Sequence, residues 1–249
     1  MLSLQLDVGN TATKWRLMDR GRRVNGGRCS LDAESLDRLA SLSPDELWVA
    51  SVASDQVEAQ LCRDFQRHGL KPEFVRAANE CAGVRNSYAE PGKMGVDRWL
   101  AMLGAYRAHP GGVVVVDAGT AATIDLVAPD GRHIGGYILP GFRLMCSSLT
   151  GSTGRVRYDN AAEVSLRPGR QTADCVEGAA WLALVSAVSG AIEQYTVAEG
   201  VVPDVVLTGG DAQVIAGLAG SRAAGWSIVE ELVLDGLQLA VQAKGSGGG

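Results

Sequence analysis

The stretch Asp7-Val8-Gly9-Asn10-Thr11-Ala12-Thr13-Lys14 is repeated, with few changes, as Asp117-Ala118-Gly119-Thr120-Ala121-Ala122-Thr123-Ile124. Each copy follows a short apolar run, residues 2–6 and 113–116, which predicts a buried strand. A carboxylate at a strand end can hold a cation, and a turn rich in Gly and Thr can bind phosphate through backbone N–H groups and hydroxyls. The repeat therefore predicts two related domains that face one another and clamp a nucleotide between them.

One Asp-x-Gly turn after a strand would most often be a plain β-turn, but two copies in matching contexts favour a functional role. The copies differ at Lys14, which aligns with Ile124. A lysine after such a turn can neutralise phosphate charge, although Lys14 as a solvated strand residue is the alternative. If the two carboxylates face one another across a cleft, bound cations would relieve their repulsion.

Composition excludes several classes of protein. The chain has 249 residues, 46% of them hydrophobic, and a net charge of −5 without a basic block, which argues against nucleic acid as a partner. Five widely spaced cysteines without a C-x-x-C pair argue against a disulfide framework or a zinc site and suit a reducing compartment. The N-terminus does not resemble a signal peptide, and the apolar stretch 179–192 is too short and interrupted to span a bilayer. We therefore expect a cytoplasmic protein that does not bind membranes.

Both halves of the chain predict three meandering strands followed by alternating helices and strands, which indicates an α/β fold with a mixed sheet in each half. The expected domains are 1–110 and 111–244, with a flexible tail at 245–249 and a linking helix at 96–108. Expected strands are 2–6, 14–18, one near 24, 47–52, 73–76, 113–116, 123–127, 134–139, 205–207 and 227–229. Expected helices are 30–42 with its cap at Ser30, 56–68, 171–198, one after the turn 208–212, and 233–244.

Three further segments and one tyrosine are candidates for a role in the chemistry. In Gly95-Val96-Asp97-Arg98, Asp97 could act as a base for an alcohol and Arg98 could hold an anion, with Gly95 admitting substrate to the backbone; the alternative is a surface ion pair at a helix start. Tyr88 could be a half-buried core residue or wall a small-molecule pocket. The glycines of Gly135-Gly136-Tyr137-Ile138-Leu139-Pro140-Gly141 suggest a loop that lies close to a ligand or to the partner domain. Alternatively, they serve only the geometry of a structural turn. The turn Thr208-Gly209-Gly210-Asp211-Ala212 lies where a nucleotide can rest on a helix N-terminus. Neither a Walker P-loop nor a strand followed by G-x-G-x-x-G is present.

Taken in order, these motifs resemble those of the type III pantothenate kinases, a family of the acetate and sugar kinase, Hsp70 and actin superfamily. The resemblance runs from Leu4 to about Ala240 and is poorest between Thr150 and Arg170. It implies two similar ribonuclease H-like (actin-like) domains, each a mixed five-stranded sheet flanked by helices. It also implies transfer of the ATP γ-phosphoryl group to the primary hydroxyl of pantothenate, which is the first step of coenzyme A synthesis.

The resemblance further assigns roles to individual residues. Asp97 becomes the proton acceptor, Asp7 lies at the Mg²⁺-nucleotide phosphates, and Asp117 holds a monovalent cation, potassium or ammonium. The family is dimeric, so that Thr172 would reach the substrate of the neighbouring subunit. The implied ATP-binding residues are Asp7, Val8, Gly9, Asn10, Thr11, Ala12, Thr13, Lys14 and Thr120, and the implied pantothenate-binding residues are Tyr88, Gly95, Val96, Asp97, Arg98 and Thr172.

Two alternatives remain open. A kinase for another small hydroxy acid or for a sugar would share the nucleotide clamp but not the Gly-x-Asp-Arg segment. A nucleotide-binding regulatory protein without turnover would keep the turns and have no use for Asp97. The chain retains each acid that phosphoryl transfer needs, which favours the enzyme.

Overall fold

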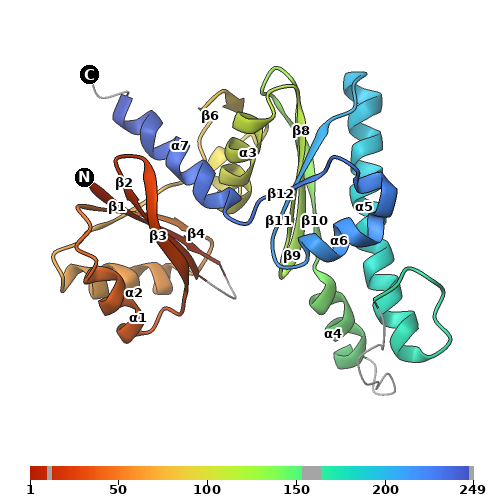
Figure 1. Cartoon of the computed structure of the whole chain (residues 1–249), viewed down its shortest axis with the longest axis horizontal. Helices are drawn as coiled ribbons and strands as arrows, with labels where there is room; N and C mark the ends of the chain where they lie inside the picture. The colour runs from red at the N-terminus through yellow and green to blue at the C-terminus, as the bar shows by residue number, and fades with distance from the viewer. Residues whose placement is uncertain (10–12, 153–163, 247–249) are drawn as a thin grey trace. The chain divides into compact units, whose positions relative to one another are not determined.

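The chain divides into two compact units, one formed by Met1–Ala108 with Glu231–Gly249 and the other by His109–Glu230. The computed structural model (Figure 1) describes residues 1–9, 13–152 and 164–246. The boundary after Ala108 lies at the end of helix α3 (Val96–Ala108), which coincides with the helix expected at 96–108.

The first unit contains a five-stranded mixed sheet in the order β3-β2-β1-β4-β5. Strand β1 pairs antiparallel with β2, which pairs antiparallel with β3, and β1, β4 and β5 run parallel. The elements of this sheet and the helices between its strands are β1 (Leu2–Val8), β2 (Thr13–Asp19), β3 (Arg22–Cys29), α1 (Ala33–Ala40), β4 (Glu46–Ser51), α2 (Asp55–Gln66) and β5 (Pro72–Phe74).

Helices cover both faces of this sheet. Alternate residues of β1, among them Leu4, Leu6 and Val8, are fully buried in one core with α1 and α2. The intervening residues face α7 (Leu232–Ser246), as the hydrogen bond between the Gln5 and Gln238 side chains shows. Because side chains alternate along a strand, Asp7 belongs to the same face as Gln5. The unit is completed by α3, a small hairpin of β6 (Glu80–Cys81) and β7 (Val84–Arg85), and the 3₁₀ turn η1 (Pro91–Lys93).

The second unit repeats this topology. Its sheet has the order β10-β9-β8-β11-β12, with the first three strands antiparallel and β8, β11 and β12 parallel. Helices α5 and α6 pack on one face in a shared apolar core. The prediction of two similar domains with mixed five-stranded sheets is confirmed. The elements are β8 (Val113–Ala118), β9 (Ala121–Val127), β10 (His133–Pro140), α4 (Phe142–Ser152), α5 (Thr172–Glu199), β11 (Asp204–Thr208), α6 (Ala212–Ala219), η2 (Gly220–Ala223) and β12 (Ser227–Ile228).

The C-terminal helix belongs to the first unit, whereas the sequence placed 231–244 in the second domain. Two glycines explain this packing, since they let α7 approach α3 until the backbones touch. A Cβ at Gly236 would lie 1.8 Å from the Leu100 carbonyl oxygen, and one at Gly104 would lie 2.8 Å from the Leu232 carbonyl oxygen. Larger residues at either position would hold the helices apart.

Two smaller expectations also differ from the structure. The N-cap of α1 is Asp32, whose Oδ1 accepts from the Ser35 backbone N–H at 2.8 Å, and Ser30 supports the cap through its hydroxyl rather than forming it. Helix α4 follows Gly141 where no helix was expected, because its sequence, rich in Ser and Thr after the first turn, lacks a clear 3.6-residue period.

Helix α5 is long and apolar enough, by length and composition, to cross a membrane. Its most apolar 18-residue window has a mean hydropathy of 1.6, and a third of that window is buried. Trp181, Leu184, Val188 and Tyr195 nevertheless pack into the core of the second unit. A core helix of a soluble protein has the same composition, and the absence of a membrane partner stays a prediction.

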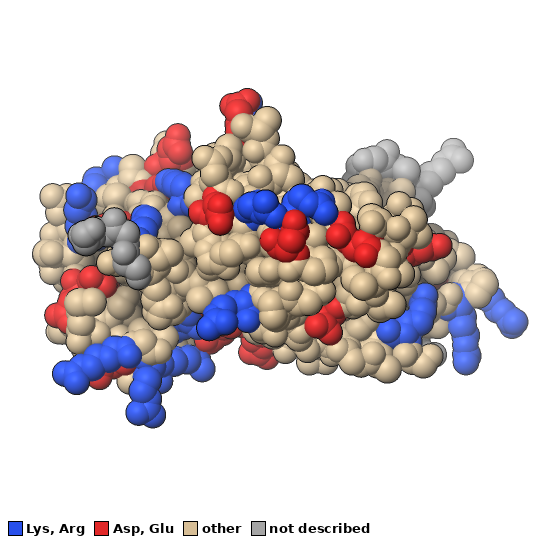
Figure 2. Space-filling view, turned by 90° about the horizontal axis from the view of Figure 1, so that it is seen from above, with Lys and Arg blue, Asp and Glu red and all other residues tan. Residues whose placement is uncertain are grey.

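Acidic and basic side chains are mixed on the face drawn in Figure 2, without a continuous basic surface there. The absence of a nucleic-acid partner stays a prediction.

Candidate functional site

The first repeated turn brings a carboxylate and an ammonium group together on adjacent strands. Asp7 on β1 pairs in register with Lys14 on β2. Directly opposed residues of an antiparallel pair have Cβ atoms about 5 Å apart on the same face of the sheet. This end of the hairpin therefore presents one anionic and one cationic group, as phosphate and metal binding requires.

The remaining predicted ATP-binding residues of this turn fall into two groups. Val8 and Thr13 are 0% and 2% exposed, so both residues lie in the interior of the first unit, and their part in ATP binding stays a prediction. Gly9 is partly exposed. Asn10, Thr11 and Ala12 lie outside the described residues.

The second repeated turn places Asp117 between two threonines. Asp117 on β8 pairs with Thr123 of β9 on one side and with Thr208 of β11 on the other. The alignment of Lys14 with Ile124 is corrected by this register, because Ile124 pairs with Val116 and is 1% exposed in the core. The second turn is one residue shorter, and Thr123 is the counterpart of Lys14.

Backbone hydrogen bonds from two loops fix the Asp117 turn. The Ala118 carbonyl accepts from the Asp211 backbone N–H at 3.0 Å, and the Thr120 carbonyl accepts from the Gly141 N–H at 2.9 Å. A Cβ at Gly141 would lie 2.1 Å from the Gly119 carbonyl oxygen. Gly141, at the end of the 135–141 segment, therefore lies against a turn of its own unit. This contact fits the structural role that was the alternative for this segment.

Gly209 brings the other loop against the Asp117 carboxylate. It has φ +91°, and a Cβ there would lie 2.6 Å from Asp117 Oδ1 and 2.3 Å from the Ala118 carbonyl oxygen. Next to it, burial raises the pKa of Asp211, and the positive charge of Arg143 opposes that rise. The turn thus holds one carboxylate close to backbone, with Thr120 exposed beside it.

In the Gly95–Arg98 segment, Gly95 precedes α3 and the other three residues form the first turn of that helix. The Oδ1 atom of Asp97 accepts from the Arg98 backbone N–H at 2.7 Å, and the Gly95 carbonyl accepts from the Trp99 N–H at 3.1 Å. A Cβ at Gly95 would lie 2.7 Å from Asp97 Oδ1. Glycine at this position therefore leaves the carboxylate of Asp97 its space.

Arg98 is held by Tyr88, and this contact joins two residues that the sequence had assigned to one site. Arg98 is 6% exposed, and its Nη1 donates to the Tyr88 hydroxyl at 2.8 Å. The guanidinium carbon also lies 5.7 Å from the centre of the Tyr88 ring, which is within cation–π range. A solvated surface ion pair, the alternative for this segment, does not fit a buried guanidinium. Val96 is 5% exposed and forms part of the core.

Thr172, the last predicted substrate residue, is exposed at the first position of α5. Metal binding was assigned to the single carboxylates Asp7 and Asp117, and this assignment stays a prediction. Within residues 1–9, 13–152 and 164–246, no group of three or more His, Cys, Asp or Glu could hold a metal ion. Mg²⁺ commonly binds through one or two carboxylates together with substrate phosphates and water, so Asp7 suits a metal that arrives with a nucleotide.

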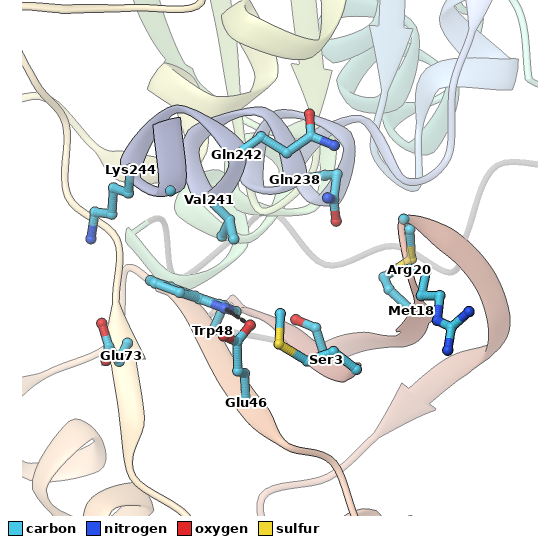
Figure 3. A pocket seen from close by; sticks show the side chains of 13 residues that line it. Ser3, Met18, Arg20, Glu46, Trp48, Glu73, Gln238, Val241, Gln242 and Lys244 are labelled. Carbon is cyan, nitrogen blue, oxygen red and sulfur yellow. Dashed lines mark hydrogen bonds between the residues drawn. The ribbon is translucent and has the colours of Figure 1, made fainter. Parts of the chain in front are cut away.

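A separate cavity of about 600 Å³ lies between α7 and the other end of the sheet (Figure 3). Trp48 forms part of its wall, where its Nε1 donates to Glu46 at 3.2 Å and the Lys244 ammonium lies 5.2 Å from its ring centre. Ser3 also lines it, four residues before Asp7 on β1, which is a distance of about 13 Å along a strand. None of the predicted site residues that the structure describes lines this cavity.

Solved structures of other proteins have a fold similar to that of this chain. A Baf family protein from Campylobacter jejuni covers 98% of the chain and 99% of its own length at a TM-score of 0.60 and 17% identity. A ROK hexokinase from Thermus thermophilus covers 100% of both chains at a TM-score of 0.55 and 13% identity. These likenesses show the fold of the chain, which consists of two actin-like domains as expected.

Sequence comparison then narrows the class. The sequence model of the type III pantothenate kinases matches residues 3–194. A type III pantothenate kinase from Pseudomonas aeruginosa LESB58 is 41% identical over 250 residues, which cover 95% of this chain and 98% of the relative. The chain belongs to the type III pantothenate kinase family, and the resemblance inferred from the motifs is confirmed.

Proposed function

We propose that the protein transfers the γ-phosphoryl group of ATP to pantothenate and forms 4′-phosphopantothenate, the first step of coenzyme A biosynthesis. The observation that carries this proposal is 41% identity to a type III pantothenate kinase over 95% of the chain. In this reaction the bond between the γ-phosphorus of ATP and its bridging oxygen breaks, and a bond from phosphorus to the pantothenate hydroxyl oxygen forms. The hydroxyl group loses its proton in the same reaction.

Nucleotide binding is assigned to the two repeated turns. Asp7 would hold Mg²⁺ with the nucleotide, and Lys14 opposite it would neutralise phosphate charge; residues 8–13 and Thr120 would add backbone and hydroxyl donors. Phosphoryl transfer has a loose transition state with charge on the transferred oxygens, so positioning and positive charge are the main contributions of the protein. The register that sets Lys14 against Asp7 supplies both.

Acceptor activation is assigned to the start of α3. Asp97 would take the proton from the pantothenate hydroxyl, because its carboxylate is oriented by the Arg98 backbone N–H. Pantothenate carries a carboxylate, the group that guanidinium binds best, and Arg98 is already oriented by Tyr88. Tyr88, Gly95, Val96 and Arg98 would hold the substrate of their own subunit, and Thr172 would reach that of the neighbouring subunit.

Asp117 is proposed as the ligand of a potassium or ammonium ion. Its carboxylate lies beside the carbonyl of Ala118 and the side of Gly209, and Thr123 stands where the first unit has a lysine. A strand-end carboxylate beside a carbonyl oxygen and a threonine supplies the oxygen ligands that a hard cation prefers. The required magnesium ion and the monovalent ion would thus be separated between the two turns.

A homodimer in the cytoplasm completes the proposal. Leu144 and Leu149 on α4 and Leu182 on α5 are 48%, 45% and 50% exposed, and exposed apolar side chains of this size favour contact with another chain. Thr172 begins the same helix, α5, so a partner packed there could receive it at its own site. The molecular mass measured by light scattering at micromolar concentration tests this, and a monomer would contradict it.

The activity itself is tested by ADP release from ATP and Mg²⁺ in potassium salt, with and without pantothenate. We expect release that depends on pantothenate, whereas sugars and acetate serve as matched acceptors that should not support it. Turnover with a sugar would identify a kinase of another specificity. ATP binding without turnover on any acceptor would indicate a nucleotide-binding regulatory protein.

A further inference from the structure

Arg16 is a charged residue in the interior of the first unit. Its side chain is 5% exposed, and its Nε donates to Gln5 Oε1 at 2.8 Å. Its Nη1 donates to Asp235 Oδ1 at 2.7 Å, and its Nη2 donates to the Leu234 carbonyl. Well-packed apolar residues commonly replace buried ion pairs without loss of stability. Stability alone therefore does not explain a guanidinium at this buried position, and its location in the fold is the feature to consider.

The groups that Arg16 contacts join the β1–β2 hairpin to α7. Gln5 and Arg16 are opposed in register, and the Nε2 atom of Gln5 donates to Gln238 Oε1 at 2.6 Å. The two side chains thus hold α7 at Leu234, Asp235 and Gln238. We call these five residues the Arg16 network.

The Arg16 network lies next to the proposed phosphate-binding pair. Along the two strands, the next opposed pair on the same face is Asp7 with Lys14. Two residues of a strand span about 7 Å. A shift of the hairpin relative to α7 would therefore move Asp7 and Lys14 with it.

The opposite side of α7 contacts the helix that carries Asp97. Gly236 of α7 lies against the backbone of Leu100, and Gly104 of α3 lies against the backbone of Leu232. Leu100 follows Asp97 by three residues, which is less than one helical turn. Helix α7 is therefore fixed to the nucleotide-side strands on one side and to the acceptor-side helix on the other.

We propose that Arg16 is a positioning residue for phosphoryl transfer. Through α7 it sets the distance between Asp7 and Lys14, which would hold the phosphates, and Asp97, which would accept the proton. This inference rests on the proposed function of those three residues. Misplacement by about 1 Å can reduce a rate about 100-fold, because reacting groups must meet in a narrow geometry.

The test compares three variants by kcat, KM for both substrates and melting temperature. Asp235→Ala removes the nearer of two carboxylates beside Arg16 at a half-exposed position, since Glu231 Oε2 lies 3.8 Å from the same Nη1; we expect kcat to fall about tenfold or more, with little change in either KM. Arg16→Lys keeps the charge but loses the planar fork, so that it cannot donate to all three groups, and it should also lower kcat. Arg67→Gln is the control, because it removes an ion pair to Asp64 at the exposed end of α2, away from the Arg16 network, and should leave kcat unchanged.

A double variant separates positioning from general damage. If the Arg16 network acts by placing Asp97, Asp235→Ala should cost little further kcat in an Asp97→Asn background. Multiplicative losses would overturn the proposal, as would a folded Asp235→Ala or Arg16→Lys variant with normal kcat. If Asp235→Ala does not fold, Arg16→Lys decides the matter, and failure of both to fold would make the network purely structural. Absence of turnover in the unchanged protein would instead refute the proposed function.

Discussion

Gly236→Ala tests how closely α7 must approach α3. The added Cβ would lie 1.8 Å from the Leu100 carbonyl oxygen, 2.5 Å from its carbonyl carbon and 2.8 Å from its Cα. All three are backbone atoms, so no change of rotamer can relieve the overlap. An ordinary contact of 3.4 Å requires the helices to separate locally by about 1.6 Å.

The expected loss of stability combines two opposing effects. Overpacking a well-packed contact costs about 1–3 kcal/mol, and an overlap with rigid backbone belongs at or above the upper end of that range. Alanine regains about 1 kcal/mol over glycine in a helix interior. We therefore expect a net loss of about 2 kcal/mol, which for a protein of this size lowers the melting temperature by about 4–8 °C.

The matched control is Gly190→Ala in the middle of α5. A Cβ there meets nothing within 4 Å, so this variant should gain up to about 1 kcal/mol from helix propensity. Thermal and urea unfolding of both variants provides the measurement. If Gly236→Ala were as stable as the unchanged protein, or more so, the close contact between α3 and α7 would be refuted.

Three further outcomes follow from the site and from the first unit. Asp97→Asn should bind both substrates, by calorimetry, and lose about 10²- to 10⁴-fold in kcat; a near-normal kcat would show that Asp97 is structural. Activity should be higher in potassium than in sodium at equal ionic strength, and Asp117→Ala should remove that difference with most of the activity; equal rates in both salts argue against a specific ion site. Glu58→Gln should cost about 1 kcal/mol of unfolding free energy at pH 7, because Arg76 bonds both Glu58 oxygens, at 2.9 and 2.5 Å. Arg76 lowers the pKa of Glu58, so this stabilisation is present above the ordinary value of 4.5 and disappears as pH falls; an equal deficit in urea unfolding at pH 7 and at acid pH would contradict the assignment.

The repeated turns were predictable because their signals are local. A short apolar run followed by Asp-x-Gly specifies a buried strand and a tight turn without reference to the rest of the chain. The same locality explains why Asp7, Lys14 and Asp117 were found at strand ends. The contact between Tyr88 and Arg98 required more, since ten residues separate them and a family resemblance supplied the connection.

The register of the second hairpin shows a signal that was present and not used. Ala122, Ile124 and Leu126 alternate along β9 and are all buried, which places Ile124 in the core. Alternation of side chains then leaves Thr123 on the face of Asp117. Counting residues from the aspartate hid this, because the two turns differ in length by one residue.

The placement of α7 could not be read from local pattern. An apolar helix at the end of the chain suits either unit equally well. The choice depends on Gly104 and Gly236, which matter through their contact with a distant backbone, and on Arg16, whose partners lie 218 and 219 residues away. The sequence of helix α5 has the same limitation. Its apolar circumference predicts that the helix is buried, but not which elements pack against it.

The register also shows where the two copies of the fold diverged in function. Gln5 is opposed to Arg16 in the first hairpin and Val115 to Asp125 in the second, so by register the position of Arg16 corresponds to Asp125. Both residues are buried charged groups, 4% and 2% exposed. Asp125 finds its partner locally, in His133 at 3.1 Å on the neighbouring strand.

Arg16 instead reaches out of its hairpin to a helix that comes from the end of the chain. A pair between neighbouring strands stabilises a sheet, whereas a contact to a separate helix can also transmit a displacement. The Arg16 network joins the hairpin to α7, and α7 contacts the helix that carries Asp97. The first unit also keeps Lys14 where the second has Thr123, so the proposed cationic group for phosphate and the link to the proposed acceptor side occur in the same copy. The presence of both features in the first unit is what a kinase needs if that unit has to align the phosphates with the hydroxyl that attacks them.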